Sequence, residues 1–583
     1  MSLMSALYTG TSGLQTSQNA LNTTGHNLTN IDTVGYTRQQ VEQADKSYIT
    51  IQRNTSIISN KQYGLGVEYA DVKQVRDYFL DKSYRQESGR LAFYEVSRDV
   101  MLEIESQLGE MQGKAFQEAV TDLWTSVEEM SKDPCSSVTQ ALFAQKASEF
   151  IERAGAVYEG FSDYQDNLNA QIKQQIEKIN KYGNRILELN EKIGAIEAGG
   201  IERANDLRDE RNYILDQLGD LAKISFSEDQ WHHVSVQIEG VDFVKGSMCY
   251  EIALDQDKET GFYTPFWPMN ASYTINNDGN KVYDTDGAEV FNLKIEISTD
   301  HNTDIGRIKG MLLARGDHRA DYTDDLNNYS AIEQSVVMNV QAEFDLLIHS
   351  VSTKINEVIG AAAGVKTNTD GLTFTLEDGT ELKGENIKYA KVDTTDTGGY
   401  LRDNSGRPMQ IFVKSVTDGY VKATGSDNEE YWVYVDEIPD RKDSLYSVRN
   451  IQINQELMQS PGELGFRLID GSEDNDTMAK LKEAYRSEEY FLNPRVRKAS
   501  NFESFYNDLV AQIGNSGYVY KGIYDNQENT VESITSAREQ IVGVSSDEEL
   551  SNMIKFQNAY NASSRYINVI SEMLEHIITT LGR

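Results

Sequence analysis

The sequence predicts a mainly α protein with β insertions: an elongated, discontinuous helical trunk of paired N- and C-terminal helices, with two inserted β-rich modules. Three observations lead to this fold class. Apolar residues with heptad spacing occupy both ends of the 583-residue chain. Between the ends, long stretches repeat apolar residues at helical spacing. Twice, near residues 224 and 365, that spacing gives way to the alternation that is typical of strands.

The N-terminal segment 1–45 is predicted to form one half of a terminal coiled-coil domain. No Asp, Glu, Lys or Arg occurs in residues 1–31. Leucines recur at a spacing of seven, with one more a turn earlier, which is typical of a helix that supercoils against another helix. The predicted seam consists of Leu3, Leu7, Leu14, Leu21 and Leu28. Gly10, Gly13 and Gly25 weaken this helix, so we expect it to be loose in the free monomer and ordered in an assembly.

The C-terminal segment 545–583 is predicted to form the other half of that domain. Its apolar seam steps by alternating four and three residues. The seam consists of Phe556, Tyr560, Ser563, Ile567, Ile570, Leu574, Ile577 and Leu581. Two seams on one chain suggest that the ends meet. Packing within one chain and packing between copies both fit the periodicity, and the uncharged first 31 residues favour packing between copies.

The rest of the chain is predicted to be a trunk with two interruptions. Trunk helices are expected within 46–223, 317–362 and 481–544. The longest apolar stripe runs from Leu168 to Ile196 and is predicted to be trunk core. A separate helix is expected before it at 138–158.

Two β-rich modules are predicted at 224–316 and 363–480. In the first module, residues alternate from Val234 to Ile238 and again from Leu293 to Ile297, which indicates strands. In the second, Asp-Gly pairs at 370–371 and 378–379 indicate turns.

Composition excludes several classes of function. The formal net charge is −37, from 92 acidic and 55 basic residues, so binding to nucleic acid or to an anionic membrane surface is not expected. No run of 18 apolar residues predicts a membrane span. Cys135 and Cys249 form no disulfide or metal pattern. The N-terminus lacks the features of a cleaved secretory signal, which leaves open an export route without cleavage.

The sequence offers no catalytic, cofactor or metal site. The adjacent His232 and His233 would point to opposite faces of a strand and could not chelate together. The segment 284–287 (Asp-Thr-Asp-Gly) resembles part of a calcium loop but lacks the downstream glutamate, so a turn is the better interpretation. Nucleophile, phosphate-loop and dinucleotide motifs are absent. We therefore expect a protein that is not an enzyme and has no cofactor.

One stretch carries a family resemblance. Residues 25–36 resemble the signature near the N-terminus of flagellar axial proteins, the family of rod, hook and hook-associated subunits. The next three residues look like the hook-associated form of that signature. The matching residues are Asn27, Leu28, Asn30, Thr33, Gly35, Tyr36, Thr37, Arg38 and Gln39. His26 stands where the family usually has Asn, which leaves its role open.

Three further stretches are similar to hook-associated members of the family. They are 64–80, with Gly64, Gly66 and the run Val75-Arg76-Asp77; 205–211, with the run Asn205-Asp206-Leu207-Arg208-Asp209; and 543–563. In the last stretch, Ser545-Ser546 stands where the family often has Asn-Leu. The four stretches together cover both ends and the trunk.

The resemblance implies a structural role outside the cell. It implies unfolded export through the flagellar type III apparatus, without a cleaved signal peptide, and self-association in a ring at the hook–filament junction. It implies hook protein and the second hook-associated protein as neighbours, and an export chaperone at the C-terminal helix. It also places the terminal helices in the inner tube and the β modules outside.

Two alternatives remain at this point. The chain could be another axial protein, such as the second junction protein or the hook subunit. It could also be an axial scaffold whose β module is an enzyme, for which neither module offers a motif. For Arg38 and Arg76 we hypothesise pairing with acids across subunit boundaries.

Overall fold

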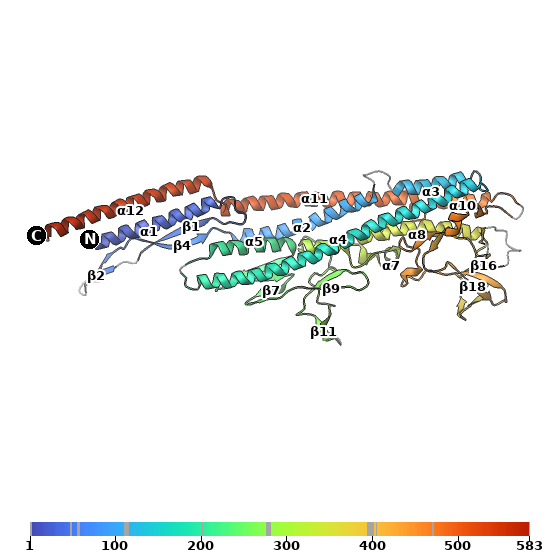
Figure 1. The fold of residues 1–583 in the computed structure, drawn as a ribbon, viewed down its shortest axis with the longest axis horizontal. Coiled ribbons are helices and arrows are strands. Elements are labelled where there is room, and N and C mark those ends of the chain that lie inside the picture. Colours follow the sequence, from blue (N-terminus) through green and yellow to red (C-terminus); the bar gives the residue numbers. More distant parts are fainter. Residues whose placement is uncertain are drawn as a thin grey trace.

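The computed structural model describes residues 3–46, 49–54, 59–109, 116–200, 202–275, 281–392, 401–403, 405–468 and 471–581. The molecule is long and narrow, with both chain ends at the same end of its long axis (Figure 1). The predicted meeting of the two ends is therefore confirmed. The predicted fold class, a helical trunk with β insertions, is confirmed as well.

A terminal unit occupies the end that holds both termini (Figure 1). It consists of α1 (Leu3–Thr29), β1 (Gln39–Asp45), β2 (Ile49–Asn54), β3 (Ser59–Tyr63), β4 (Val67–Gln74) and α12 (Ser546–Leu581). Strands β1 and β4 form one antiparallel pair, and β2 and β3 form another. Helix α1 packs against α12 on one side and against β1 and β4 on another.

The trunk is built from long helices that run roughly along the same axis (Figure 1). They are α2 (Tyr78–Leu108), α3 (Phe116–Met130), α4 (Ser137–Glu197), α5 (Asn205–Leu221), α6 (Arg307–Arg315), α7 (Tyr322–Ile332), α8 (Val336–Ala362), α10 (Asn475–Arg486) and α11 (Phe502–Val542). Their apolar faces enclose one continuous core. At its centre, the Phe344 ring lies 5.0 Å from the Phe116 ring and 6.0 Å from the Phe161 ring, measured between centroids.

The first β module is antiparallel and lies beside α4. Its strands are β5 (Ile224–Glu228), β6 (Val234–Ile238), β7 (Val241–Lys245), β8 (Met248–Cys249), β9 (Ala253–Gln256), β10 (Tyr263–Phe266), β11 (Ser272–Ile275) and β12 (Lys281–Asp284). Strands β5 to β8 form one sheet in sequence order, and the others form two hairpins. The alternation predicted for 234–238 is confirmed, because Val234, Val236 and Ile238 are buried and the residues between them are not.

The second module contains a six-stranded antiparallel sheet in the order β13-β16-β19-β18-β14-β15. The elements of the module are β13 (Lys366–Thr367), β14 (Thr373–Leu376), β15 (Glu381–Lys383), β16 (Lys388–Lys391), β17 (Phe412–Lys414), β18 (Tyr420–Gly425), β19 (Glu430–Tyr434), β20 (Ile451–Ile453) and the short helix α9 (Gln455–Gln459). Gly371 and Gly379 both have positive φ, as turns that favour glycine require.

Four local predictions were wrong. The helical trunk does not begin at residue 46, because the strands β2 to β4 precede its first helix, α2. The helices expected on either side of residue 160 are one helix, α4, because Phe161 and Gln165 are buried and continue its core-facing stripe. The alternation at 293–297 forms no strand among the residues that the structure describes. The end of the first predicted module, 307–315, is the trunk helix α6, whose Gly310 lies close to Phe93 of α2.

Glu343 on α8 gives the trunk core a pH-dependent stability. Its carboxylate is fully buried and accepts hydrogen bonds from Asn493 Nδ2 (2.7 Å) and Gln512 Nε2 (3.0 Å). Burial raises the pKa of Glu343 to about 8, although these two bonds lower it in part. Burial likewise raises the pKa of Asp345, two residues further along α8, to about 7. Above the ordinary carboxyl pKa, the folded chain therefore keeps protons that the unfolded chain has released.

We expect the free energy of unfolding to fall as the pH rises through this window, and to become level above about pH 8. Glu343→Gln should make the fall smaller, because the glutamine does not ionise. Urea midpoints at several pH values between about 5 and about 9 measure the effect, with the exposed Glu188→Gln as the control. A Glu343→Gln protein with the pH profile of the wild type would contradict this account.

Candidate assembly interface at the joined termini

Helices α1 and α12 approach each other closely because the facing side of α1 is made of small residues. A Cβ added to Gly10 would lie 2.8 Å from Ile567 Cγ1, and one added to Gly13 would lie 2.9 Å from Ser563 Oγ. The residues on this side of α1 are separated alternately by four and by three positions. They are Ala6, Gly10, Gly13, Ser17, Ala20, Thr24 and Asn27, all buried except Gly13, which is half-buried.

The leucines of the predicted N-terminal seam lie beside this small-residue stripe. Four of them directly follow one of its members in the sequence, and all five are half-buried in the single chain. They are Leu3, Leu7, Leu14, Leu21 and Leu28. The leucine stripe therefore borders the contact with α12 and keeps part of its apolar surface open.

The predicted C-terminal seam follows the side of α12 that is least exposed. Ile570 is buried, whereas Ile577 is 38% exposed. The half-buried members are Phe556, Tyr560, Ser563, Ile567 and Leu574. The side chain of Leu581 lies outside the described residues.

Other apolar side chains of the terminal unit are exposed. On α12, Val569 is 46% exposed and Ile578 is 69% exposed. On α1, Met4 and Tyr8 are more than half exposed. A single copy of the chain thus leaves apolar surface uncovered on both terminal helices, on which another protein surface could pack.

The signature residues form a compact turn at the end of α1. Asn27 is buried, and its Oδ1 accepts hydrogen bonds from the Tyr36 hydroxyl (2.8 Å) and the Gln39 amide (3.0 Å). Its Nδ2 donates to the Gln39 carbonyl (2.9 Å). Asn30 Oδ1 accepts from the Thr33 hydroxyl (3.1 Å). These side chains form hydrogen bonds with backbone groups that have no partner within the helix or the turn.

Gly35 completes the turn. Its φ is +83°, and an added Cβ would lie 3.2 Å from Tyr213 Cβ on α5. A residue with a side chain would be strained in this conformation and would crowd Tyr213. The glycine thus lets the turn lie directly on the trunk.

Two acidic residues of α5 form hydrogen bonds with the turn. Asp209 Oδ2 accepts from the Thr37 amide (3.2 Å), and its Oδ1 accepts from Gln74 Nε2 (2.8 Å). Asp206 Oδ1 lies 3.3 Å from both His26 Nε2 and Gln39 Nε2. Burial raises the pKa of Asp209 to about 6, although the bonds from Thr37 lower it in part.

The basic residues of the same α5 stretch point elsewhere. Arg208 pairs with Glu197 (2.7 Å) at the end of α4. Arg211 is buried and donates to Asn190 Oδ1 (2.9 Å). In this stretch, Asp206 and Asp209 therefore face the terminal unit, whereas Arg208, Arg211 and also Glu210, which pairs with Arg185, face α4.

Arg38 and Arg76 find their partners within the same chain. Arg38 Nε bonds Glu549 Oε1 (2.9 Å), and its Nη1 lies 2.8 Å from Glu548 Oε2. Arg76 forms a bidentate ion pair with Asp81, in which both hydrogen bonds are 2.9 Å long. Both arginines are thus paired with acids in the single chain, and their pairing across subunit boundaries stays a prediction.

A buried chain of charges continues from Asp81 into the trunk. Arg538 of α11 pairs with Asp81 (2.8 Å) and with Asp216 (2.6 Å), which also binds Arg85 (2.7 Å). Burial alone would raise the pKa of Asp81, but the bond to Arg76 and the nearby guanidinium charges outweigh it and lower the pKa. The chain of charges ties α2, α5 and α11 together next to the terminal unit.

Sequence reasoning missed several residues of this interface. Glu548 and Glu549 lie in the first turn of a helix, where acids have a local explanation as caps, and Asp216 and Arg538 carry no motif. The available signal was the set of resembling stretches 25–39, 64–80, 205–211 and 543–563. The structure brings all four together around the boundary between terminal unit and trunk.

The candidate metal residues do not form a metal site. His232 lies 3.4 Å from Glu228 and 3.5 Å from Glu197. Among the described residues, no group of three His, Cys, Asp or Glu side chains could hold a metal ion. Residues 284–287 form a turn after β12, in which the Ala288 amide bonds the Thr285 carbonyl (3.0 Å).

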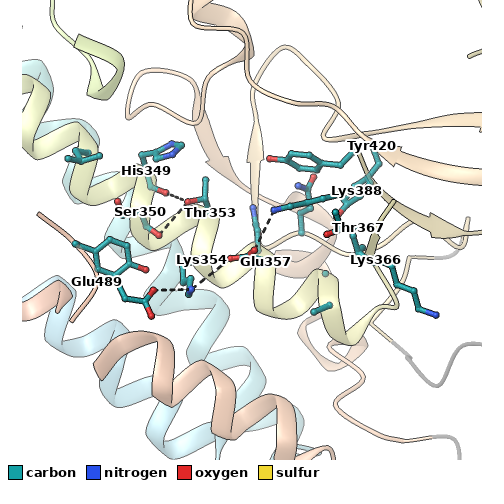
Figure 2. A pocket seen from close by; sticks show the side chains of 18 of the residues that line it. His349, Ser350, Thr353, Lys354, Glu357, Lys366, Thr367, Lys388, Tyr420 and Glu489 are labelled. Carbon is teal, nitrogen blue, oxygen red and sulfur yellow. Dashed lines mark hydrogen bonds and ion pairs between the residues drawn. The ribbon is translucent and has the colours of Figure 1, made fainter. Parts of the chain in front are cut away.

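A pocket of about 700 Å³ lies between α8 and the second β module (Figure 2). Its charged side chains bind one another: Lys354 lies 3.5 Å from Glu489, and Lys388 lies 3.4 Å from Glu357. The Thr353 hydroxyl donates to the His349 carbonyl (2.6 Å) within the helix. The pocket is thus a cleft between two parts of the fold in which two lysines are paired with glutamates.

None of the helices in the described ranges is long and apolar enough to cross a membrane.

Three family models match the chain. "Flagella basal body rod protein" matches residues 7–37, "Flagellar hook-associated protein FlgK helical domain" matches 101–374, and "Flagellar basal body rod FlgEFG protein C-terminal" matches 539–580. The chain is 23% identical to flagellar hook-associated protein 1 of Bacillus subtilis, over 99% of this chain and 98% of that protein. It is 22% identical to the protein of that name from Escherichia coli, over 97% and 98%.

One solved structure, the flagellar hook junction protein FlgK from Burkholderia pseudomallei, aligns with 79% of this chain and 99% of that chain, at 11% identity and a TM-score of 0.49.

The terminal unit and the matches at both ends define the class of protein: a structural subunit of the flagellum, of the kind that builds its rod and hook. The helical-domain match and the near full-length relatives agree with each other, and both show that the chain is similar to the FlgK family, the family of hook-associated protein 1.

Proposed function

We propose that this chain is a structural subunit of the hook–filament junction and that it polymerises through α1 and α12. The observation that carries the proposal is the apolar surface that one copy leaves uncovered on both terminal helices, including Val569 and Ile578. Neighbouring copies would cover it and form a ring. The family matches at 7–37 and 539–580 coincide with these two helices.

The remaining steps of the proposal rest on the similarity to the FlgK family. The chain is exported unfolded by the flagellar type III apparatus, with a chaperone on the C-terminal helix before export. It then lies outside the cell between the hook protein and the second hook-associated protein. The β modules project from the trunk and carry no catalytic role.

Glutamate at exposed positions of α12 tests the assembly surface. We expect Val569→Glu and Ile578→Glu to fold like the wild type, because both side chains are largely exposed in the single chain. In a deletion strain that expresses either variant, electron microscopy should show hooks without filaments, with flagellin in the medium. Charge buried between copies without a partner prevents their packing.

Tyr518→Glu on α11 is the matched control, since Tyr518 is 79% exposed on the trunk. This variant should support filaments. Normal filaments with both α12 variants would overturn the proposed assembly surface. Absence of hooks in the deletion strain would instead indicate the alternative role of a hook subunit.

A further inference from the structure

We infer that one side of α4 is an interaction surface for polypeptide backbone, which attaches the first β module to the trunk. The module lies along α4 (Figure 1). Three asparagines of the helix contact it, spread over about 30 Å at the rise of an α-helix. They are Asn169, Asn180 and Asn190. Each uses its carboxamide to bond both a backbone amide and a backbone carbonyl of the module.

Two of these asparagines bond both backbone groups of a single module residue. Asn190 Nδ2 donates to the Val234 carbonyl (2.9 Å), and its Oδ1 accepts from the Val234 amide (3.1 Å). Asn180 pairs in the same way with Ile252, and both of its hydrogen bonds are 2.9 Å long. A residue of an antiparallel neighbour strand bonds its partner in this manner. Each carboxamide therefore takes the place of a neighbour strand.

Asn169 bonds the module where β10 begins. Its Oδ1 accepts from the Tyr263 amide (2.8 Å), and its Nδ2 donates to the Gly261 carbonyl (3.1 Å). Arg315 of α6 donates to the same Oδ1 (2.7 Å) and also to the Tyr263 carbonyl (2.9 Å). An asparagine and an arginine thus bond the module backbone together at this end of the surface.

The other end of the surface has the same arrangement. Arg211 of α5 donates to Asn190 Oδ1 (2.9 Å) and to the His232 carbonyl (2.7 Å). Arg211 is 1% exposed and Asn190 is 2% exposed. Hydrogen bonds from a charged donor are stronger than those between neutral groups, and buried polar groups are costly to leave unpaired. The bonds to the backbone are therefore an integral part of the attachment.

Apolar packing contributes to the same attachment in a different way. Phe243 of β7 lies against α4 at Gly183, where an added Cβ would lie 2.4 Å from Phe243 Cζ. Apolar packing is non-directional, whereas hydrogen bonds require a defined distance and angle. The asparagines therefore supply the direction of the contact.

The second β module is attached to α8 by the same kind of contact. Asn356 Nδ2 donates to the Phe412 carbonyl (2.6 Å), and its Oδ1 accepts from the amides of Phe412 (3.2 Å) and Ile411 (2.9 Å). Since β17 pairs with β20, the asparagine occupies the other edge of β17. Two modules far apart in the sequence are thus held through their backbones.

Backbone recognition makes the attachment tolerant of changes in the bonded side chains of a module. Every residue except proline supplies both an amide and a carbonyl, so a substitution that keeps the course of the backbone keeps these hydrogen bonds. The contact lies in the trunk, away from the terminal helices, and does not depend on the proposed assembly.

Hydrogen exchange in the full chain, followed by mass spectrometry of its peptides, tests this inference. Asn180→Ala removes both hydrogen bonds to Ile252. We expect amides in 250–256 to exchange about tenfold faster than in the parent chain, since two hydrogen bonds are lost. Asn356→Ala should have the same effect on 410–414 in the second module, and it gives an answer if Asn180→Ala fails to fold, as judged by circular dichroism.

Two matched variants separate backbone recognition from other causes. Asn184→Ala, at an exposed position of α4, removes a hydrogen bond to the Glu251 side chain (2.8 Å) and should leave exchange in 250–256 unchanged. Ile252→Val alters the bonded residue but keeps its backbone, so exchange should rise by no more than about threefold. Parent-like exchange in Asn180→Ala, or an equal rise in Ile252→Val, overturns the inference.

Discussion

Asp216→Ala is expected to lower the free energy of unfolding of the trunk by about 3–5 kcal/mol, since it removes one partner from a buried ion network. Asp216 binds Arg85 (2.7 Å) and Arg538 (2.6 Å), and the Arg85 side chain is 2% exposed. Without the carboxylate, two guanidinium groups remain between α2, α5 and α11 with less compensating charge. Urea denaturation followed by circular dichroism measures the change as a shift of the midpoint.

The matched control is Glu188→Gln. Glu188 also joins two bases, Arg185 and Lys192, but it is half exposed on the surface of α4. Its loss should lower the free energy of unfolding far less, because ion pairs at the surface are screened by water. Equal effects of the Asp216 and Glu188 substitutions would show that burial of the network contributes nothing.

Phe344→Ala is expected to lower the free energy of unfolding by about 3–5 kcal/mol, because it opens a cavity in the trunk core. Phe344 is fully buried, and its ring packs against Phe116 and Phe161. These rings come from α8, α3 and α4, so the cavity weakens the contact of three helices. Phe344→Leu keeps most of the side-chain volume, so it should lower the free energy of unfolding by less than about 1.5 kcal/mol.

The same urea experiment separates the two variants. If Phe344→Ala and Phe344→Leu unfold at the same midpoint, volume at this position does not determine the stability of the trunk. Tyr518→Ala, on the exposed side of α11, serves as a control for the loss of an aromatic ring without loss of core packing.

The terminal helices show how far periodicity could predict this fold. Heptad spacing identified both helices and the meeting of the chain ends. It emphasised leucines, because large apolar residues dominate such patterns, whereas α1 approaches α12 through Gly10 and Gly13. Close helix contacts need small residues, and small residues carry little hydrophobic signal.

The boundary between the terminal unit and the trunk could be predicted only in part. The stretches that surround it were recognisable by their resemblance to a family. The partners of Arg38 were not, because Glu548 and Glu549 lie more than 500 positions further along the chain. Acids at the start of a helix have a sufficient local explanation as caps, so no sequence signal pointed to a second role.

Helix boundaries depended on packing that the sequence does not display. A polar stretch near residue 160 suggested the end of one helix and the start of another. In the structure, Phe161 and Gln165 face the core, and Gln165 Nε2 bonds the Arg315 carbonyl (2.7 Å). A tertiary contact therefore continues a helix where local propensity favours a break.

The uninterrupted length of α4 makes the trunk a lever. Its 61 residues span about 90 Å at the rise of an α-helix. A rotation of about 5° at one end of such a rod displaces the other end by about 8 Å, which is comparable to the spacing between packed helices. Small changes of angle near the terminal unit would therefore be magnified into large displacements at the far end of the trunk.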